Sequence, residues 1–135
     1  MKITEQEALR AYARMLNTGD LSHLEPLLPS DFHYGSQMVS GDLSSKAAFC
    51  EYMSAKLLTI AGSDLPVYAE MGQVWAYGAE RPCVVLAQGT PENRIGMALV
   101  YVNDGVLRRI DLCVVPAPQS ARGTGEYPGT NGGGL

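Results

Sequence analysis

The sequence has little positive charge, and this limits its partners. Its 135 residues include 10 Lys and Arg against 14 Asp and Glu, which gives a formal net charge of −4 at pH 7. A protein that binds nucleic acid through the phosphates needs a clustered cationic face. The only adjacent basic pair, Arg108 and Arg109, lies within a strand-like stretch. We therefore expect no nucleic-acid partner.

Long apolar runs are also missing. The sequence contains no stretch of about 18 apolar residues, which is roughly the length that a membrane-spanning helix needs. The first seven residues are polar and do not resemble the apolar segment of a signal peptide. From these two absences we expect no membrane association and a cytoplasmic location.

Signatures of metal and cofactor sites are absent as well. Cys50, Cys83 and Cys113 lie far apart, so they predict small buried residues rather than a disulfide framework or a zinc site. His23 and His33 have no ligand spacing, and the chain contains no glycine-rich phosphate loop or dinucleotide fingerprint. We expect neither a metal nor a cofactor.

The first half of the chain has the periodicity of three helices. Thr4 and Glu7 form a capping box ahead of apolar residues at helical spacing, and Gly19 suits the left-handed position that ends a helix. Asp20 can cap a short second helix. A third helix is predicted to begin after one of the serines at positions 44 and 45 and to end at Gly62.

The apolar period changes to two in the second half. Strands are predicted at residues 31–39, 67–77, 82–88, 94–102 and 106–115. Turn-rich segments separate them, and Asp104 and Gly105 are good residues for a tight hairpin turn. Helices followed by a strand meander predict an α+β fold, in which three N-terminal helices pack on one face of a mostly antiparallel sheet.

The composition changes after Val115. Residues 116–135 are rich in glycine and proline and have Tyr127 as their only aromatic residue. Such a segment buries too little surface to offset its ordering entropy, so we expect a domain at residues 1–115 and a flexible tail at residues 116–135. The alternative is a tail that becomes ordered against a partner subunit or over the mouth of a cavity.

The order of the elements is familiar. Its sequence markers are Tyr12, the segment Leu16-Asn17-Thr18-Gly19-Asp20, Leu28, Asp31-Phe32 and the last strand at residues 106–112. This arrangement resembles the nuclear transport factor 2 (NTF2)-like superfamily, which includes SnoaL-like polyketide cyclases and ketosteroid isomerases. The resemblance implies a cystatin-like cone in which a curved sheet wraps around the helices and encloses an apolar cavity. It also implies a homodimer formed through the convex face of the sheet.

The resemblance further implies a role for Tyr12. Ketosteroid isomerases have a tyrosine at the matching place on the first helix, where its hydroxyl donates a hydrogen bond to a developing oxyanion. Their general-base aspartate would fall near Ser36, and their protonated aspartate near Ala98. Because serine cannot take a proton from carbon unaided, we do not expect steroid isomerisation by this set of residues.

Two other residues are candidates for acid–base chemistry. His33 could act as a general base if a bulge near Gly35 turned it inward, whereas strict alternation turns it outward. Asp111 lies in an apolar strand and either pairs with Arg109 or Arg94 or points inward with a raised pKa. With Tyr12, these two residues complete the candidate catalytic set.

A cavity in this fold would be lined by apolar and aromatic side chains. The residues predicted to bind a ligand are Tyr34, Ser36, Phe49, Tyr52, Met53, Trp75, Val100 and Leu112. They favour a protein that binds a small, largely apolar molecule, as a non-metal isomerase, cyclase or dehydratase would. The alternative is a ligand-binding or dimerisation module without catalysis.

Overall fold

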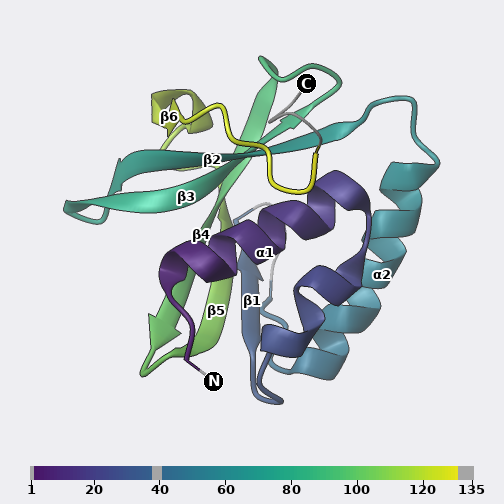
Figure 1. The fold of residues 1–135 in the computed structure, drawn as a ribbon, viewed down its shortest axis with the longest axis vertical. Helices are drawn as coiled ribbons and strands as arrows, with labels where there is room; N and C mark the ends of the chain where they lie inside the picture. The colour runs from purple at the N-terminus through teal and green to yellow at the C-terminus, as the bar shows by residue number, and fades with distance from the viewer. Residues whose placement is uncertain (1, 38–40, 131–135) are drawn as a thin grey trace.

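The computed structural model describes residues 2–37 and 41–130, and it has the predicted α+β architecture (Figure 1). Its helices are α1 (Glu5–Thr18) and α2 (Lys46–Ala61), with the short 3₁₀ helices η1 (Leu21–His23), η2 (Glu25–Leu27) and η3 (Pro118–Ser120). Its strands are β1 (His33–Ser36), β2 (Val67–Ala76), β3 (Ala79–Gln88), β4 (Arg94–Asn103), β5 (Val106–Cys113) and β6 (Arg122–Gly123).

The helix ends follow the predicted caps. The amide of Glu7 donates to the hydroxyl of Thr4 at 3.1 Å, and a Glu7 carboxylate oxygen accepts from the Thr4 amide at 2.8 Å, which completes the capping box of α1. Gly19 ends α1 with φ 73°, and the carboxylate of Asp20 accepts from the amide of Ser22 to start η1. Ser45 caps α2.

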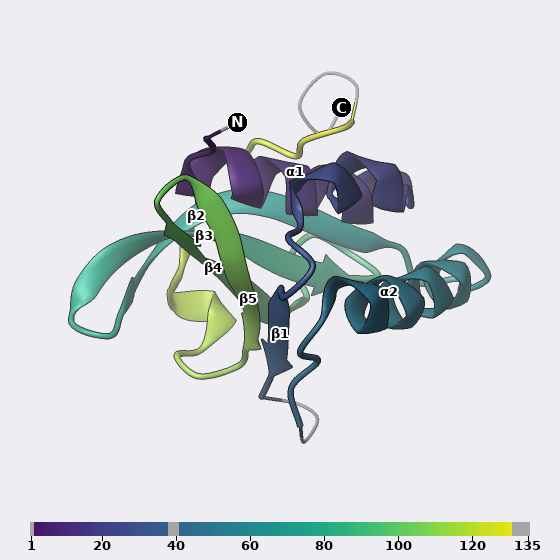
Figure 2. The same ribbon diagram turned by 90° about the horizontal axis from the view of Figure 1, so that it is seen from below.

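The sheet combines a meander with one parallel strand. Its order is β1-β5-β4-β3-β2-β6, so β2 to β5 form antiparallel neighbours in sequence. β1 pairs parallel to β5, with Tyr34 opposite Ile110. α1 and α2 lie on one side of this sheet, as the second view shows (Figure 2).

One turn lies earlier than predicted. Asp104 and Gly105 form the expected hairpin turn between β4 and β5, both with positive φ. The β2–β3 hairpin turns at Tyr77 and Gly78, again with positive φ, and β3 resumes at once at Ala79. The prediction of a turn over residues 78–81 was wrong because two residues with positive φ suffice to reverse an antiparallel chain.

Apolar side chains are buried on both faces of the sheet. The larger cluster fills the space between the helices and the sheet and includes Leu9, Phe32 and Ile110. A smaller cluster on the opposite face includes Val85, Met97 and, from the C-terminal segment, Ala121. The smaller cluster therefore includes a side chain from beyond residue 115.

The segment after residue 115 differs from the flexible tail that we expected. Through residue 130 it lies against the domain: η3 packs beside β4, β6 pairs with β2, and the following residues contact α1. Backbone pairing and specific polar contacts replace the apolar burial that its composition lacks. The last five residues, 131–135, lie outside the described residues.

Candidate functional site

Two buried tyrosines meet between the helices and the sheet. Tyr12 of α1 and Tyr34 of β1 are 0% and 2% exposed. Neither hydroxyl has a hydrogen-bond partner among the described residues. A buried hydroxyl without a partner costs about 1–3 kcal/mol, so two of them at one place are an unusual feature of this core.

The electrostatic environment keeps both phenols protonated. Burial raises the pKa of Tyr12 well above its ordinary value, and the phenol of Tyr52 raises it further. Burial also raises the pKa of Tyr34, with added contributions from the Tyr12 and Tyr52 phenols. The Tyr52 hydroxyl is near enough to that of Tyr34 to raise this pKa, but the two do not have the geometry of a hydrogen bond. Near neutral pH both groups are therefore neutral hydroxyls that can donate a hydrogen bond.

Aromatic packing fixes the position of Tyr34. Its ring centroid lies 5.2 Å from that of Phe49 and 5.6 Å from that of Tyr52, both on α2. Phe49 in turn meets Phe32 edge to face, with centroids 5.1 Å apart. Met53, one turn beyond Phe49, is fully buried in the same cluster. The structure thus brings five of the predicted residues together: Tyr12, Tyr34, Phe49, Tyr52 and Met53.

A small apolar pocket lies between α1, α2 and the sheet. It has a volume of about 50 Å³, and its walls include Leu16 of α1, Lys56 and Ile60 of α2, and Leu112 of β5. Leu16 and Lys56 each lie one helical turn after a tyrosine of the cluster, on α1 and on α2. The pocket therefore lies one turn further along both helices than the tyrosines, which do not line it.

Asp111 does not reach this interior. It pairs across the sheet with Leu99, which lies in the apolar cluster on the face away from the helices. Its carboxylate accepts from Nε of Arg109 at 2.8 and 3.0 Å, the pairing that we considered from the sequence. The guanidinium of Arg109 also donates to Asp42 at 2.8 Å, and this hydrogen bond holds the pKa of Asp42 below its usual range.

Gly35 makes room for this charged group. A Cβ at that position would lie 2.5 Å from a guanidinium nitrogen of Arg109 and 2.7 Å from a carboxylate oxygen of Asp111. His33 is exposed on the same strand, and the register of β1 with β5 is continuous. No bulge turns His33 inward, so Tyr12, His33 and Asp111 do not form one site.

The remaining predicted lining residues are spread over different parts of the sheet. Trp75 is 66% exposed because the β2–β3 hairpin projects beyond α1 (Figure 2). Val100 is half-buried and packs on the main core, while Ser36 lies at the rim of β1, in a pocket of about 240 Å³ that also contains Asp111. Leu112 is buried and lines the small inner pocket.

The structure adds residues that the sequence analysis did not choose. Lys56 and Ile60 form the outer wall of the inner pocket. Helical spacing from Tyr52 (i+4 and i+8) is the signal that could have found them. Lys56 Nζ lies 5.7 Å from the centre of the Tyr52 ring, and the half-buried Lys56 side chain lines the pocket.

An open pocket lies on the opposite face of the sheet. It has a volume of about 300 Å³ and is lined in part by Tyr77, Leu99, Tyr101 and Asp111. Tyr77 and Tyr101 are 68% and 58% exposed. Aromatic side chains that are this exposed, beside charged groups, are typical of surfaces that contact another molecule.

Two searches of the described residues complete the survey. Within residues 2–37 and 41–130, no three His, Cys, Asp or Glu side chains lie close enough together to hold a metal ion. Neither α1 nor α2, nor any shorter helix in that part of the chain, has the length and apolar character needed to cross a membrane.

Comparisons with known proteins relate this chain to solved structures alone. No protein-family model matches it, and no curated protein is found as a relative. A SnoaL-like protein of unknown function from Burkholderia thailandensis is similar over 84% of this chain and 98% of its own, with 16% identity and a TM-score of 0.59. An NTF2-like protein of unknown function from Cytophaga hutchinsonii covers 88% and 96%, with 14% identity and a TM-score of 0.56.

A third structure is a candidate ketosteroid isomerase from Kribbella flavida. It matches over 83% of this chain and 79% of its own, with 19% identity and a TM-score of 0.55. At such identities a likeness establishes the fold, since one fold carries many functions. The chain therefore has the cystatin-like α+β fold that NTF2-like, SnoaL-like and ketosteroid isomerase-like proteins share.

Proposed function

We propose that this protein binds a small, largely apolar molecule carrying one hydrogen-bond-accepting oxygen, in the interior between α1, α2 and the sheet. The observation that carries the proposal is the pair of buried hydroxyls of Tyr12 and Tyr34, which lack partners among the described residues. A carbonyl oxygen placed between them would satisfy both donors. The apolar body of the molecule would occupy the pocket beside Leu16 and Leu112.

The size of the pocket decides how the ligand enters. A volume of about 50 Å³ is well below the roughly 300 Å³ of a typical ligand pocket, so the pocket must widen. α2 is the movable wall, because its buried side chains are Phe49, Met53 and Leu57, whereas Lys56 and Ile60 remain partly exposed. In this proposal the C-terminal half of α2 moves outward when the ligand binds.

The chemistry of the interior favours binding without acid–base catalysis. No Asp, Glu, His, Lys or Arg among the described residues is buried. Isomerases and cyclases that move a proton need a base within hydrogen-bond reach of carbon, and the phenols here are held neutral. Two neutral donors can hold a carbonyl group but cannot take up a proton at neutral pH. We therefore favour the non-catalytic alternative.

Cyclohexanone, a six-carbon ring with one carbonyl, is a suitable probe. A ligand that binds only the folded state raises the melting temperature, so cyclohexanone is expected to stabilise the wild-type protein in a concentration-dependent way. The double variant Tyr12→Phe/Tyr34→Phe keeps the apolar walls but removes both donors. Its melting temperature is expected to change little with cyclohexanone.

The matched control is Tyr101→Phe, which removes an exposed hydroxyl on the other face of the sheet. This variant should respond to cyclohexanone as the wild type does. An equal response of the wild type and the Tyr12→Phe/Tyr34→Phe variant would contradict the proposal, and so would a wild type that does not respond.

A second candidate function, homodimerisation through the face away from the helices, is supported by its exposed aromatic residues. Tyr77 and Tyr101 flank an open pocket there, next to the Arg109–Asp111 ion pair. Aromatic residues and arginine are enriched in protein interfaces. Light scattering should show a dimer for the wild type and a monomer for Tyr101→Glu. Leu58→Glu, at an exposed position on α2, is the control that should remain dimeric.

A further inference from the structure

The C-terminal segment follows an unusual path around the sheet. η3 lies against the face away from the helices, where Pro118 and Ala121 are buried. Residues 122–130 then pass the free edge of β2 and end beside α1, on the other side of the sheet (Figure 2). We call residues 122–130 the strap.

Backbone pairing holds the strap to β2. The amide of Thr124 donates to the carbonyl of Met71 at 2.9 Å, and the amide of Met71 donates to the carbonyl of Glu126 at 2.9 Å. The Thr124 hydroxyl donates to the same Met71 carbonyl at 2.9 Å. These contacts satisfy the edge of β2 as an added strand would, which is the way sheet edges bind extended peptides.

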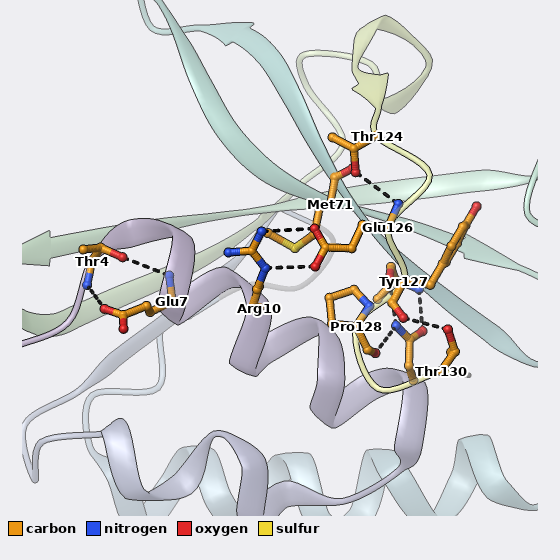
Figure 3. A network of polar contacts seen from close by, with 11 residues as sticks. Thr4, Glu7, Arg10, Met71, Thr124, Glu126, Tyr127, Pro128 and Thr130 are labelled. Carbon is orange, nitrogen blue, oxygen red and sulfur yellow. Dashed lines mark hydrogen bonds and ion pairs between the residues drawn. The ribbon is translucent and has the colours of Figure 1, made fainter. Parts of the chain in front are cut away.

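A bidentate ion pair fixes the register. Nε of Arg10 donates to one carboxylate oxygen of Glu126 at 2.9 Å, and a second guanidinium nitrogen donates to the other oxygen at 3.1 Å (Figure 3). The hydrogen bond from Arg10 lowers the pKa of Glu126. A fork of two parallel hydrogen bonds adds geometric specificity for a carboxylate at this one position of the strap.

Asn17 of α1 binds both β2 and the strap at positions beyond the pairing with Met71. The side chain of Asn17 pairs with both backbone groups of Ala69: its oxygen accepts from the Ala69 amide at 2.8 Å, and its nitrogen donates to the Ala69 carbonyl at 2.9 Å. The same nitrogen donates to the carbonyl of Pro128 at 2.8 Å. Asn17 thus connects the β2 edge to the strap where direct pairing has ended.

Glycines make this close approach possible. A Cβ at Gly72 of β2 would lie 2.9 Å from the backbone oxygen of Arg122, and a Cβ at Gly123 would lie 2.2 Å from the Glu70 carboxylate. That carboxylate accepts from the amide of Gly125 at 2.8 Å. The glycine content that suggested a flexible tail therefore matches a fitted, extended segment.

The strap is held almost entirely by polar contacts. Within residues 122–130, Pro128 is the only buried residue. The Arg10 and Glu126 side chains are 41% and 44% exposed. Local segments with little buried apolar surface open at low free energy, so the strap is expected to detach without unfolding of the domain.

We infer that the β2 edge, together with Arg10 and Asn17 of α1, is a docking site for an extended segment that carries a carboxylate, and that the strap of a second copy of this chain occupies it in exchange for the chain's own. The contacts described above are made to strap backbone, to the Thr124 hydroxyl and to the Glu126 carboxylate, and a second copy carries the identical segment. Nine residues span about 30 Å when extended, enough to reach a neighbouring copy. Exchange of an identical element costs little because no contact is lost.

Charge-reversal variants distinguish exchange of straps between two copies from attachment of each strap to its own chain. Full-length Arg10→Glu places two carboxylates together within each chain, and full-length Glu126→Arg places two guanidinium groups together. Each variant alone should take up deuterium at residues 122–130 roughly fivefold faster than the wild type. In an incubated mixture of the two, exchanged straps restore an opposite-charge pair at both sites. The mixture should then approach the protection of the wild type.

The double variant Arg10→Glu/Glu126→Arg, which has the reversed pair within one chain, controls for folding and should be protected like the wild type. Uptake in the mixture equal to the average of the two separate variants would overturn the proposal. Exposed straps in the double variant would overturn it too, because the ion pair would then not determine docking. A dimer formed only through the opposite face cannot restore protection, since each strap would still meet a like charge.

Discussion

Tyr12 and Tyr34 are the residues of this core that most clearly suggest a bound molecule. Both hydroxyls are buried, both are without partners among the described residues, and both belong to neutral phenols. In a closed apolar core such groups are a cost rather than a benefit to folding. Their presence is understandable when a bound molecule supplies the acceptor.

Removing one of these hydroxyls is therefore expected to leave the ligand-free protein at least as stable. Tyr12→Phe should raise the free energy of unfolding by about 1 kcal/mol, because the unpaired donor no longer has to be desolvated. Urea unfolding without ligand measures this. Tyr101→Phe, at an exposed site, should change stability by less than about 0.5 kcal/mol. A loss of stability in Tyr12→Phe would show that the hydroxyl has a structural partner.

The same two phenols predict a loss of stability in alkali. Their folded pKa values are raised above the unfolded value of 10.0, so their titration leaves stability unchanged well below that pH and opposes folding as the pH rises through and beyond it. Between about pH 8 and about pH 11 the urea midpoint of the wild type should fall more than that of Tyr12→Phe/Tyr34→Phe. Parallel pH profiles of the two proteins would contradict this assignment.

The contribution of Glu126 to attachment of the strap has the opposite dependence on pH. Its pKa is lowered by the hydrogen bond from Arg10, so its contribution is present at neutral pH and is lost as the pH falls below about 4.5. The protection of amides 122–130, which is the exchange rate corrected for the intrinsic effect of pH, should therefore fall in acid for the wild type. Glu126→Gln, which cannot ionise, should show low protection at both pH values, and a pH-dependent change of protection in that variant would indicate another titrating group.

At the scale of the elements, the close contact between β2 and the strap depends on Gly72. Gly72→Ala places a Cβ against the backbone oxygen of Arg122, which cannot rotate away as a side chain could. We expect the variant to release residues 122–126, with faster deuterium uptake there and little change in α2. Gly62→Ala is the control, because a Cβ at that position meets nothing closer than 3.7 Å. Unchanged uptake at residues 122–126 in Gly72→Ala would contradict the predicted close contact.

Helix starts and turns could be predicted from the sequence better than the contacts between distant parts of the chain. Caps at Thr4 and Ser45 and the turn at Asp104 rest on local chemistry, so these helix starts and this hairpin could be predicted. Trp75 was misplaced because alternation tells which face a strand residue takes but not where the covering helices end. The strap was missed because its attachment depends on partners far away in sequence, such as Arg10.

The candidate site shows the same division. Tyr12, Tyr34 and Phe49 were predicted to face the interior, and they do, because helical and strand periodicity determine that. The position of Asp111 on the outer face was settled only by the register of β4 with β5 and by its pairing with Arg109. Pocket volume depends on how the side chains of distant elements pack together, which no local pattern predicts.

In the molecule as a whole, both faces of the sheet contact other parts of the chain. The helices and the tyrosine cluster cover one face, and η3 covers part of the other beside an open pocket with exposed tyrosines. The strap joins the two faces around the edge of β2. This arrangement provides separate surfaces for the inner ligand and the outer partner that we propose.

Crystal structures of the wild-type protein grown with and without cyclohexanone test the central claim most directly. The account predicts additional density in the presence of the ketone, with its oxygen about 2.7 Å from the hydroxyls of Tyr12 and Tyr34 and with α2 displaced outward beside it. Identical interiors in the two crystals, with the two hydroxyls still closed in by apolar side chains, would contradict the claim that this core is a binding site.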